Sequence, residues 1–292
     1  MFKGALVAIV TPFKNGTVDE ESLRRLIDFQ IENGSSGIVP CGTTGESPTL
    51  SHDEHKRGIE ITVDQVKKRV PVVAGAGSNN TAEAIDLTKH AKAVGADAAL
   101  HITPYYNKPT QEGLFRHYEA IAKQAKFPLV VYNIAGRTGV NIEPATMARM
   151  AELPEIVAVK EASGSLGQMA EIVQLCGDKL TLMSGDDNLI LPILAIGGTG
   201  VISVIANIAP QQTADIINAW DAGDVKKAKE LYLKLLPLCK AMFLETNPIP
   251  VKAAAAILGL IDDGALRLPM TELAEDKVPK LKKAMSDYGL LG

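Results

Sequence analysis

The sequence has few of the features that mark secreted, membrane-spanning or nucleic-acid-binding proteins. Only three cysteines occur in 292 residues (Cys41, Cys176 and Cys239), and they have no metal-ligand spacing, which predicts reduced thiols in a cytoplasmic protein. No run of about 18 apolar residues occurs, so a membrane span is not expected. With 30 basic and 34 acidic residues, interspersed and giving a formal net charge of −4, the chain offers no basic face for a nucleic acid.

Short apolar runs are what the sequence does have, and 46% of its residues are hydrophobic. The opening "MFKGALVAIVTPF" is too short for a cleaved leader and is more typical of a first strand. Eight runs have the length and composition of buried strands. They cover residues 6–12, 37–41, 70–76, 98–104, 128–133, 156–161, 180–185 and 200–207.

Segments with helical periodicity separate these runs, and several have recognisable ends. A first helix should stop at Asn33, where Gly34 follows. Ser51 and Glu54 have the spacing of a capping box at the start of a helix. The alternation of strand and helix, eight times over, predicts a parallel (β/α)₈ TIM barrel. A doubly wound sheet is the alternative, but such sheets usually have five or six strands.

The pattern becomes wholly helical after residue 222. We therefore expect a catalytic barrel over residues 1–222 and a C-terminal helical extension over residues 223–292. Catalytic groups of a barrel lie at the carboxyl ends of its strands. By this rule the glycine-rich "IGGTG" (196–200), which precedes a strand, is expected to turn the chain at the opposite end of the barrel rather than to bind phosphate.

The strand "IVAVKE" ends on Lys160, although lysine is seldom buried without a partner or a use. Side chains alternate along a strand, so Ile156, Ala158 and Lys160 should share one face. If that face is the barrel interior, Lys160 lies beside Tyr132 of the neighbouring strand. Desolvation would lower the pKa of its amine, and a neutral amine attacks carbonyl groups. A lysine that reaches solvent or pairs with Glu161 is the structural alternative.

Other polar residues follow strands at the same end of the predicted barrel. Thr43 and Thr44 lie in a turn where backbone amides could hold a carboxylate, or where a tight turn simply leads into a helix. Tyr105 and Tyr106 form a loop pair that could serve the site or pack against a neighbouring chain. Arg137 could bind a carboxylate through its guanidinium group or form a structural ion pair.

Taken together, the motifs "GTTGE", "TPYYN", "YNIAGRTG", "VKEASG", "SGDD", "GVISVIAN" and "NPIPVK" are recognisable. In order and spacing, the chain resembles the dihydrodipicolinate synthase family of pyruvate-dependent class I aldolases, which also includes N-acetylneuraminate lyase. The resemblance covers essentially the whole sequence. One departure is Ala135, where the family usually has proline; loss of the fixed proline φ angle frees the loop that carries Arg137.

The resemblance implies a role for each matching position. Lys160 would form a Schiff base with pyruvate, and Tyr132 would transfer protons with Thr43 and with Tyr106 of a partner subunit. Pyruvate would be held by Thr44 and by the backbone near Gly185 and Ile202. Arg137 would bind the carboxylate of aspartate 4-semialdehyde. The implied activity is condensation of these two substrates, the first committed step of the diaminopimelate route to lysine.

No metal or other cofactor is implied, because the imine forms with the substrate itself. The resemblance also implies a homotetramer built as a dimer of dimers. Family members from plants and many Gram-negative bacteria are inhibited by L-lysine at a dimer-interface cleft, and partial inhibition is expected here. The matching positions are Ser47, His52, His55, Asn79, Glu83 and Tyr105.

Two other functions fit parts of the sequence. Another aldolase of the family, such as N-acetylneuraminate lyase or a keto-sugar-acid aldolase, would share the barrel lysine but would not need Arg137 as a carboxylate clamp. A non-catalytic binding protein on the same scaffold would form no covalent adduct, since a fold does not fix a function.

Overall fold

Eight parallel strands form the centre of the computed structural model, which describes residues 2–291. Their order in the sheet is β4-β1-β10-β9-β8-β7-β6-β5, and a bridge between Ile38 and Val72 brings the two edges together into a nearly closed barrel. The strands are β1 (Gly4–Ala8), β4 (Gly37–Val39), β5 (Val73–Gly75), β6 (Ala98–Ile102), β7 (Leu129–Asn133), β8 (Ile156–Glu161), β9 (Thr181–Ser184) and β10 (Gly200–Ser203). The predicted TIM barrel is therefore confirmed, and the alternative prediction of a doubly wound sheet is wrong.

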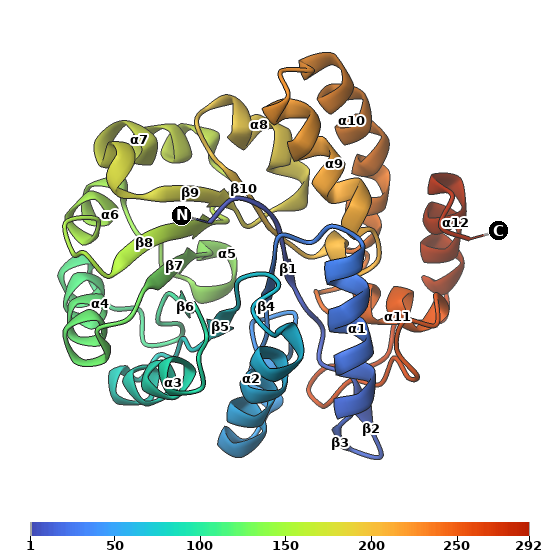
Figure 1. Ribbon diagram of the computed structural model, residues 1–292, viewed down its shortest axis with the longest axis horizontal. Helices are drawn as coiled ribbons and strands as arrows, with labels where there is room; N and C mark the ends of the chain where they lie inside the picture. The colour runs from blue at the N-terminus through green and yellow to red at the C-terminus, as the bar shows by residue number, and fades with distance from the viewer. Residues whose placement is uncertain (1, 292) are drawn as a thin grey trace.

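Helices surround the strands in a ring, and one short helix, α5, lies inside this ring beside β7 (Figure 1). They are α1 (Glu20–Glu32), α2 (His52–Val66), α3 (Thr81–Ala93), α4 (Gln111–Ala125), α5 (Ala135–Thr138), α6 (Pro144–Met150), α7 (Leu166–Cys176), α8 (Ile190–Ala195) and α9 (Pro210–Asp221). Helix α1 ends before Asn33, and Ser51 and Glu54 form the predicted capping box at the start of α2. Both helix-end predictions are thus confirmed.

Three further helices follow the barrel: α10 (Val225–Ala241), α11 (Ile249–Ile257) and α12 (Val278–Tyr288). In Figure 1 they lie together on one side of the ring, beside α9 and α1. The segment before α11 crosses back to the end of the barrel where the strands finish, as its contacts with Thr44 and Arg137 show. The C-terminal helices therefore contribute to the end of the barrel at which catalytic groups are expected.

Two hydrophobic clusters fill the protein. The larger one lies between strands and helices, and the smaller one lies inside the barrel. Full burial of an aliphatic side chain stabilises a fold by about 1.5–3 kcal/mol, so both clusters contribute substantially. The inner cluster contains Leu6, Ala8, Val39, Val73, Ala98, Leu100, Val130, Tyr132, Ala158, Ala162, Met183 and Ile202.

One prediction about the faces of β8 is wrong. Ile156 belongs to the outer cluster, whereas Ala158 is inside the barrel. The reason is a register shift between β7 and β8: Leu129 pairs with Ile156, but the next residue, Val130, pairs with Ala158. The irregularity turns Val157 partly toward the inner cluster and restores regular alternation from Ala158 onward. Lys160 still shares the face of Ala158, as predicted.

Two short strands that the sequence did not reveal, β2 (Phe13–Lys14) and β3 (Thr17–Val18), form a hairpin after β1. The segment "IGGTG" lies between α8 and β10, where Gly197 has a φ of 103° and turns the chain. The expectation that these glycines make a turn at the other end of the barrel is confirmed.

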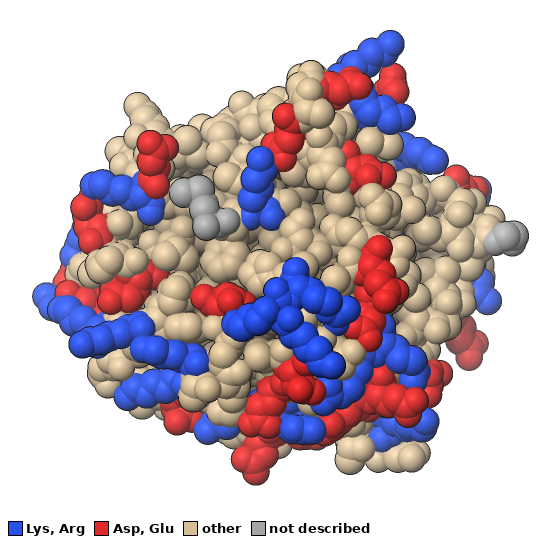
Figure 2. All heavy atoms as spheres, viewed as in Figure 1, with Lys and Arg blue, Asp and Glu red and all other residues tan. Residues whose placement is uncertain are grey.

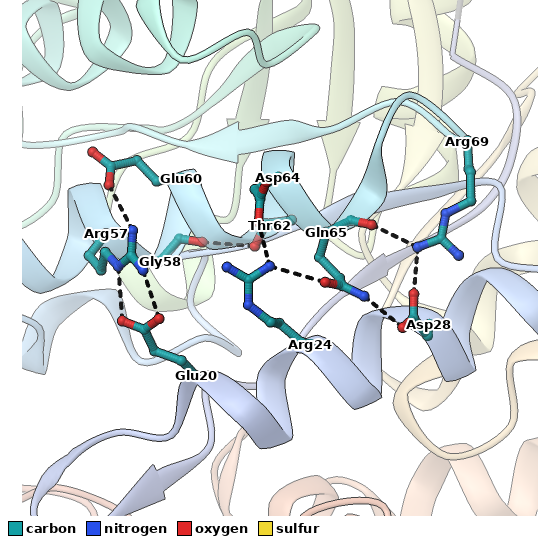
Figure 3. Close-up of polar contacts among 10 residues, drawn as sticks. All are labelled: Glu20, Arg24, Asp28, Arg57, Gly58, Glu60, Thr62, Asp64, Gln65 and Arg69. Carbon is teal, nitrogen blue, oxygen red and sulfur yellow. Dashed lines mark hydrogen bonds and ion pairs between the residues drawn. The ribbon is translucent and has the colours of Figure 1, made fainter.

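The outer surface carries charges of both signs, mixed over the face seen in Figure 2. Ion pairs join α1 to α2 along their length (Figure 3). Arg57 contacts Glu20 through two nitrogens at 2.9 and 2.8 Å, and Arg24 lies 2.5 Å from Asp64. These side chains are half exposed, so water competes with each pair.

Candidate active site

Lys160 and Tyr132 lie side by side at the ends of β8 and β7. The two residues are register partners, and Lys160 Nζ is 4.3 Å from the centroid of the Tyr132 ring. Both side chains are buried, with 4% and 6% of their surface exposed. The expected neighbour relation at the mouth of the barrel is therefore present. Lys160 makes no ion pair within 4.0 Å in the part of the chain that the structure describes, so pairing with Glu161 is not the reason for its position.

Burial changes the acid–base properties of this pair. Desolvation lowers the pKa of Lys160 from its usual 10.5 to about 8, although Asp186 and Asp187 partly oppose the shift. With a pKa near 8, about a quarter of the amine is neutral at pH 7.5, against about one part in a thousand for an ordinary lysine. Desolvation also raises the pKa of Tyr132, while the charge of Arg137 acts in the other direction. The site thus holds a nucleophilic amine beside a protonated phenol.

Gly185 follows β9 and closes one side of the lysine pocket. A Cβ atom at this position would lie 3.2 Å from Lys160 Cε and 2.7 Å from Ala162 Cβ, so only glycine leaves the lysine its room. Ile202 of β10 is fully buried in the inner cluster. The structure therefore brings both expected lining residues to the interior end of the barrel.

The turn after β4 carries Thr43 and Thr44, and its path depends on close backbone packing. A Cβ at Gly45 would lie 3.0 Å from the backbone nitrogen of Cys41 and 3.2 Å from the carbonyl oxygen of Ile9. Thr44 is 2% exposed, and its Oγ1 accepts a hydrogen bond of 3.0 Å from Asn247 Nδ2.

Cys41 is buried, and burial raises the pKa of its thiol to about 12, which leaves it unreactive.

Arg137 lies on α5, a single turn that follows β7. It forms no ion pair among the described residues; instead Nη2 donates to the carbonyl oxygen of Asn247 at 3.1 Å and lies 3.4 Å from Thr246 Oγ1. The structural ion pair considered for Arg137 is therefore absent from that part of the chain. Ala135 is the first residue of α5, a position that tolerates proline but does not require it, so the turn forms without the usual residue.

The two tyrosines after β6 are placed differently. Tyr105 is 38% exposed, and Asn79 Nδ2 donates to its carbonyl oxygen at 3.2 Å. Tyr106 is 89% exposed with a φ of 70°, which is rare for a bulky residue, and it projects from the surface. Its phenol is thus the one expected catalytic group that this chain does not place among the others.

A cavity of about 210 Å³ lies next to Tyr132, between the turn after β4 and the loops after β5 and β6. Thr43 and Tyr132 are among the residues that line it. His52 Nε2 lies 2.7 Å from Glu83 Oε1 at its rim, and His55 lies 2.7 Å from the carbonyl oxygen of Gly75. Five of the six positions expected for lysine line it, namely Ser47, His52, His55, Glu83 and Tyr105, and Asn79 holds Tyr105.

Several residues near the site were not identified from the sequence. Asn247 contacts both Thr44 and Arg137, and its motif "NPIPVK" was noted without a role for the asparagine. Asp187 is buried, and its Oδ2 accepts hydrogen bonds from the amides of Val204 and Ile205 after β10. The sequence signal for Asp187 was the acidic pair in "SGDD", but nothing in the pattern shows that one carboxylate turns toward the next strand.

Residues 2–291 contain no group of three or more His, Cys, Asp or Glu side chains that could hold a metal ion. None of the helices in this range is both long and apolar enough to cross a membrane.

Comparison with known proteins gives consistent relatives over the whole chain. A sequence model of the dihydrodipicolinate synthetase family matches residues 1–288. The chain is 60% identical over 291 residues to the 4-hydroxy-tetrahydrodipicolinate synthase of Syntrophobacter fumaroxidans, and the match covers all of both proteins.

Two crystal structures of similar proteins contain ligands. The chloride-inhibited dihydrodipicolinate synthase from Acinetobacter baumannii, complexed with pyruvate, is 46% identical and superposes with a TM-score of 0.97 over all of both chains. The DHDPS from Cyanidioschyzon merolae with lysine bound is 41% identical and has a TM-score of 0.96 over 99% of both chains.

Proposed function

Since the chain belongs to the dihydrodipicolinate synthetase family of lyases, which condense pyruvate with aspartate semialdehyde in lysine biosynthesis, we propose that Lys160 is its Schiff-base nucleophile. One observation supports this assignment above the others. Lys160 is a desolvated amine without an ion-pair partner in residues 2–291, and it lies 4.3 Å from the ring of a buried phenol. A neutral amine in such a pocket attacks the keto group of pyruvate and releases water to form an imine.

The later steps follow from the same groups. The protonated imine nitrogen accepts electrons when the methyl group of pyruvate loses a proton, which gives an enamine. The enamine carbon attacks the aldehyde of aspartate 4-semialdehyde and forms the new carbon–carbon bond. The amino group of that substrate then displaces Lys160 and closes the ring. Tyr132, which lines the same cavity as Thr43, is suited to move the protons that these steps require.

Carboxylates of the two substrates need separate partners. Thr44 and the backbone near Gly185 and Ile202 are proposed for pyruvate, because Gly185 lies against the Lys160 side chain and Ile202 belongs to the cluster inside the barrel. Arg137 is proposed for aspartate 4-semialdehyde, since its guanidinium group forms no ion pair among the described residues and two of its contacts are to neutral oxygens. A clamp of this kind suits an aldehyde that carries a carboxylate, such as aspartate semialdehyde, better than a neutral sugar aldehyde.

Sodium borohydride reduction in the presence of pyruvate tests the proposed nucleophile. The reduced adduct should appear on the peptide that contains Lys160, and Lys160→Ala should remove both the adduct and the condensation of pyruvate with aspartate semialdehyde. Lys252→Ala is a matched control because it removes a buried lysine outside the barrel mouth, and a folded preparation of it should still be labelled at Lys160. Labelling at another lysine, or none at all in the wild-type protein, would contradict the mechanism.

A partner subunit is proposed to complete the proton relay. Tyr106 projects from the surface, which suits a residue that enters the site of a neighbouring chain. We propose that the protein is a homotetramer arranged as a dimer of dimers. We also propose that it acts in the cytoplasm and needs no metal or other cofactor. The division into a barrel over residues 1–222 and a helical extension over residues 223–292 also stays a proposal.

L-Lysine is the proposed inhibitor, and the cavity beside Thr43 and Tyr132 is its proposed site. Support comes from the gathering of Ser47, His52, His55, Glu83 and Tyr105 around one cavity, with Asn79 behind Tyr105. Glu83 could pair with the lysine ammonium group. Calorimetry with millimolar L-lysine should show binding together with a partial fall in rate, and the absence of both heat and inhibition would contradict this part of the proposal.

A further inference from the structure

The segment between α10 and α11 contacts the candidate site through Thr246 and Asn247, and Asn247 makes two of these contacts. Asn247 is 5% exposed, and its Nδ2 donates a 3.0 Å hydrogen bond to Thr44 Oγ1. Its backbone oxygen accepts a 3.1 Å hydrogen bond from Arg137 Nη2. One residue of the C-terminal helical region thus contacts both groups that are proposed to bind substrate carboxylates.

The direction of the hydrogen bond to Thr44 determines what the hydroxyl can do. A threonine hydroxyl has one proton to donate and two lone pairs that accept. When Asn247 donates to Thr44 Oγ1, the hydroxyl acts as acceptor in that contact, and its own proton remains available for another acceptor. A substrate carboxylate has only acceptor atoms, so an available hydroxyl proton is what it needs.

A purely structural role accounts poorly for this asparagine. Asn247 Oδ1 is buried and has no hydrogen-bond partner among the described residues. An unpaired buried acceptor is destabilising, and an apolar side chain of similar size would avoid that cost. The amide is therefore better explained by what its nitrogen does to Thr44.

The surrounding contacts fix the position of Asn247 relative to Thr44. Two residues beyond Thr44, Glu46 forms a buried ion pair of 2.6 Å with Lys252 of α11. Glu46 Oε2 also accepts a 3.2 Å hydrogen bond from the backbone nitrogen of Arg267. The turn that carries Thr44 is thus fixed to the same C-terminal segment that carries Asn247, so their separation is set by well-packed neighbours.

We infer that Asn247 is a positioning residue that directs the hydroxyl proton of Thr44 toward the carboxylate of pyruvate. This inference rests on the proposed role of Thr44 and adds the residue that sets the donor direction of its hydroxyl. The two halves of Asn247 act on different substrates: the side chain acts on pyruvate through Thr44, and the backbone oxygen acts on aspartate semialdehyde through Arg137.

Borohydride trapping at increasing pyruvate concentration measures the inferred effect. Asn247→Ala should raise the half-saturating pyruvate concentration about tenfold, as expected for the loss of one oriented hydrogen bond to a charged group. Labelling of Lys160 at saturating pyruvate should persist. The KM for aspartate semialdehyde should change less than about twofold, because the contact with Arg137 is made by a backbone atom that the variant keeps.

Thr246→Val is the matched control on the same segment. It removes the hydroxyl that lies 3.4 Å from Arg137 Nη2 but leaves the Asn247 side chain in place. Its effect should fall on the KM for aspartate semialdehyde and not on pyruvate trapping. If Asn247→Ala and Thr246→Val changed the same parameter equally, either pyruvate half-saturation or the KM for aspartate semialdehyde, the separate roles of the Asn247 side chain and backbone would be contradicted.

A double-variant cycle with Thr44→Val tests whether Asn247 acts through Thr44. In the Thr44→Val background, Asn247→Ala should cause no further loss of pyruvate affinity. Asn247→Asp, which is nearly isosteric, should weaken pyruvate binding more than Asn247→Ala because aspartate accepts the hydroxyl proton. The part of the affinity loss in Asn247→Asp that vanishes in the Thr44→Val background measures the capture of the hydroxyl proton by aspartate. The part that persists measures charge repulsion between aspartate and pyruvate.

Folding of each variant is checked by circular dichroism, and Asn247→Asp serves if Asn247→Ala does not fold. Unchanged pyruvate half-saturation in the folded variants, or a loss that persists fully without the Thr44 hydroxyl, would overturn the inference. Absence of any Lys160 adduct in the wild-type protein would instead overturn the proposed function, so the two failures are distinguishable.

Discussion

The mouth of the barrel and the junction between the Thr44 turn and α11 each bury one lysine. At the mouth, Lys160 is 4% exposed and has no ion-pair partner among the described residues. At the junction, Lys252 is fully buried, lies 2.6 Å from Glu46 and has its ammonium group 4.0 Å from the centroid of the Phe13 ring. Both amines have left water, but only one of them has received a compensating charge.

The difference shows that burial alone does not make a lysine reactive. Desolvation lowers the pKa of both amines, and at Lys252 the Glu46 carboxylate opposes the shift and makes an ion pair. At Lys160 the carboxylates of Asp186 and Asp187 act from outside ion-pair distance, and the pKa falls to about 8. The lysine at the junction is therefore compensated by a carboxylate, whereas the amine at the mouth loses its proton more easily than an ordinary lysine.

The largest change in stability is expected when the paired lysine is removed. Lys252→Met would leave Glu46 as an uncompensated buried charge, which typically costs about 3–5 kcal/mol. Urea unfolding measured by circular dichroism should show this loss of unfolding free energy. The double variant Lys252→Met with Glu46→Leu should recover part of it, because no lone charge remains. A single variant as stable as the wild type would mean that the two buried lysines do not differ in this way.

Replacement of Lys160 should change the unfolding free energy in the opposite direction, toward greater stability. The folded-state pKa of Lys160 is depressed, so protonation at pH 7 opposes folding, and the cost disappears as the pH rises above the usual lysine pKa of 10.5. Lys160→Met should therefore raise the unfolding free energy by up to about 3 kcal/mol at pH 7 and by less than about 1 kcal/mol near pH 10.

Unfolding curves of both proteins at several pH values between 7 and 10 check this prediction. The difference between wild type and variant cancels contributions from all other titrating groups. A Lys160→Met variant that is less stable than the wild type at pH 7 would show that the amine is not held in an unfavourable environment.

The buried position of Lys160 could be predicted from the sequence, but that of Lys252 could not. "IVAVKE" places a lysine at the end of a buried strand, and strand alternation correctly put it beside Tyr132. Lys252 follows an apolar stretch in a helix, where exposed lysines are common. Its partner Glu46 is 206 positions away in the chain, and no local pattern specifies which distant groups meet.

The barrel could be predicted because each strand and helix is specified locally, by apolar runs and by caps such as Ser51. The regular alternation failed at Ile156, because the shift between β7 and β8 depends on how two strands pair and not on either sequence alone. Asn247 was missed for a similar reason. Its function depends on the crossing of the C-terminal segment over the barrel mouth, which is a tertiary contact.

The smallest effect is expected at the outer surface, where charges are paired but solvated. Arg57 and Glu20 join α1 and α2 through two contacts, yet their side chains are 49% and 43% exposed (Figure 3). A double-variant cycle of Arg57→Gln and Glu20→Gln should give a coupling below about 1 kcal/mol in urea unfolding, and smaller still in 1 M salt. Arg57 lowers the pKa of Glu20, so this coupling is present above the usual glutamate pKa and is lost as the pH falls through the lowered value. A coupling as large as that of Lys252 with Glu46 would contradict the view that loss of water, and not ion pairing as such, makes the buried pair important.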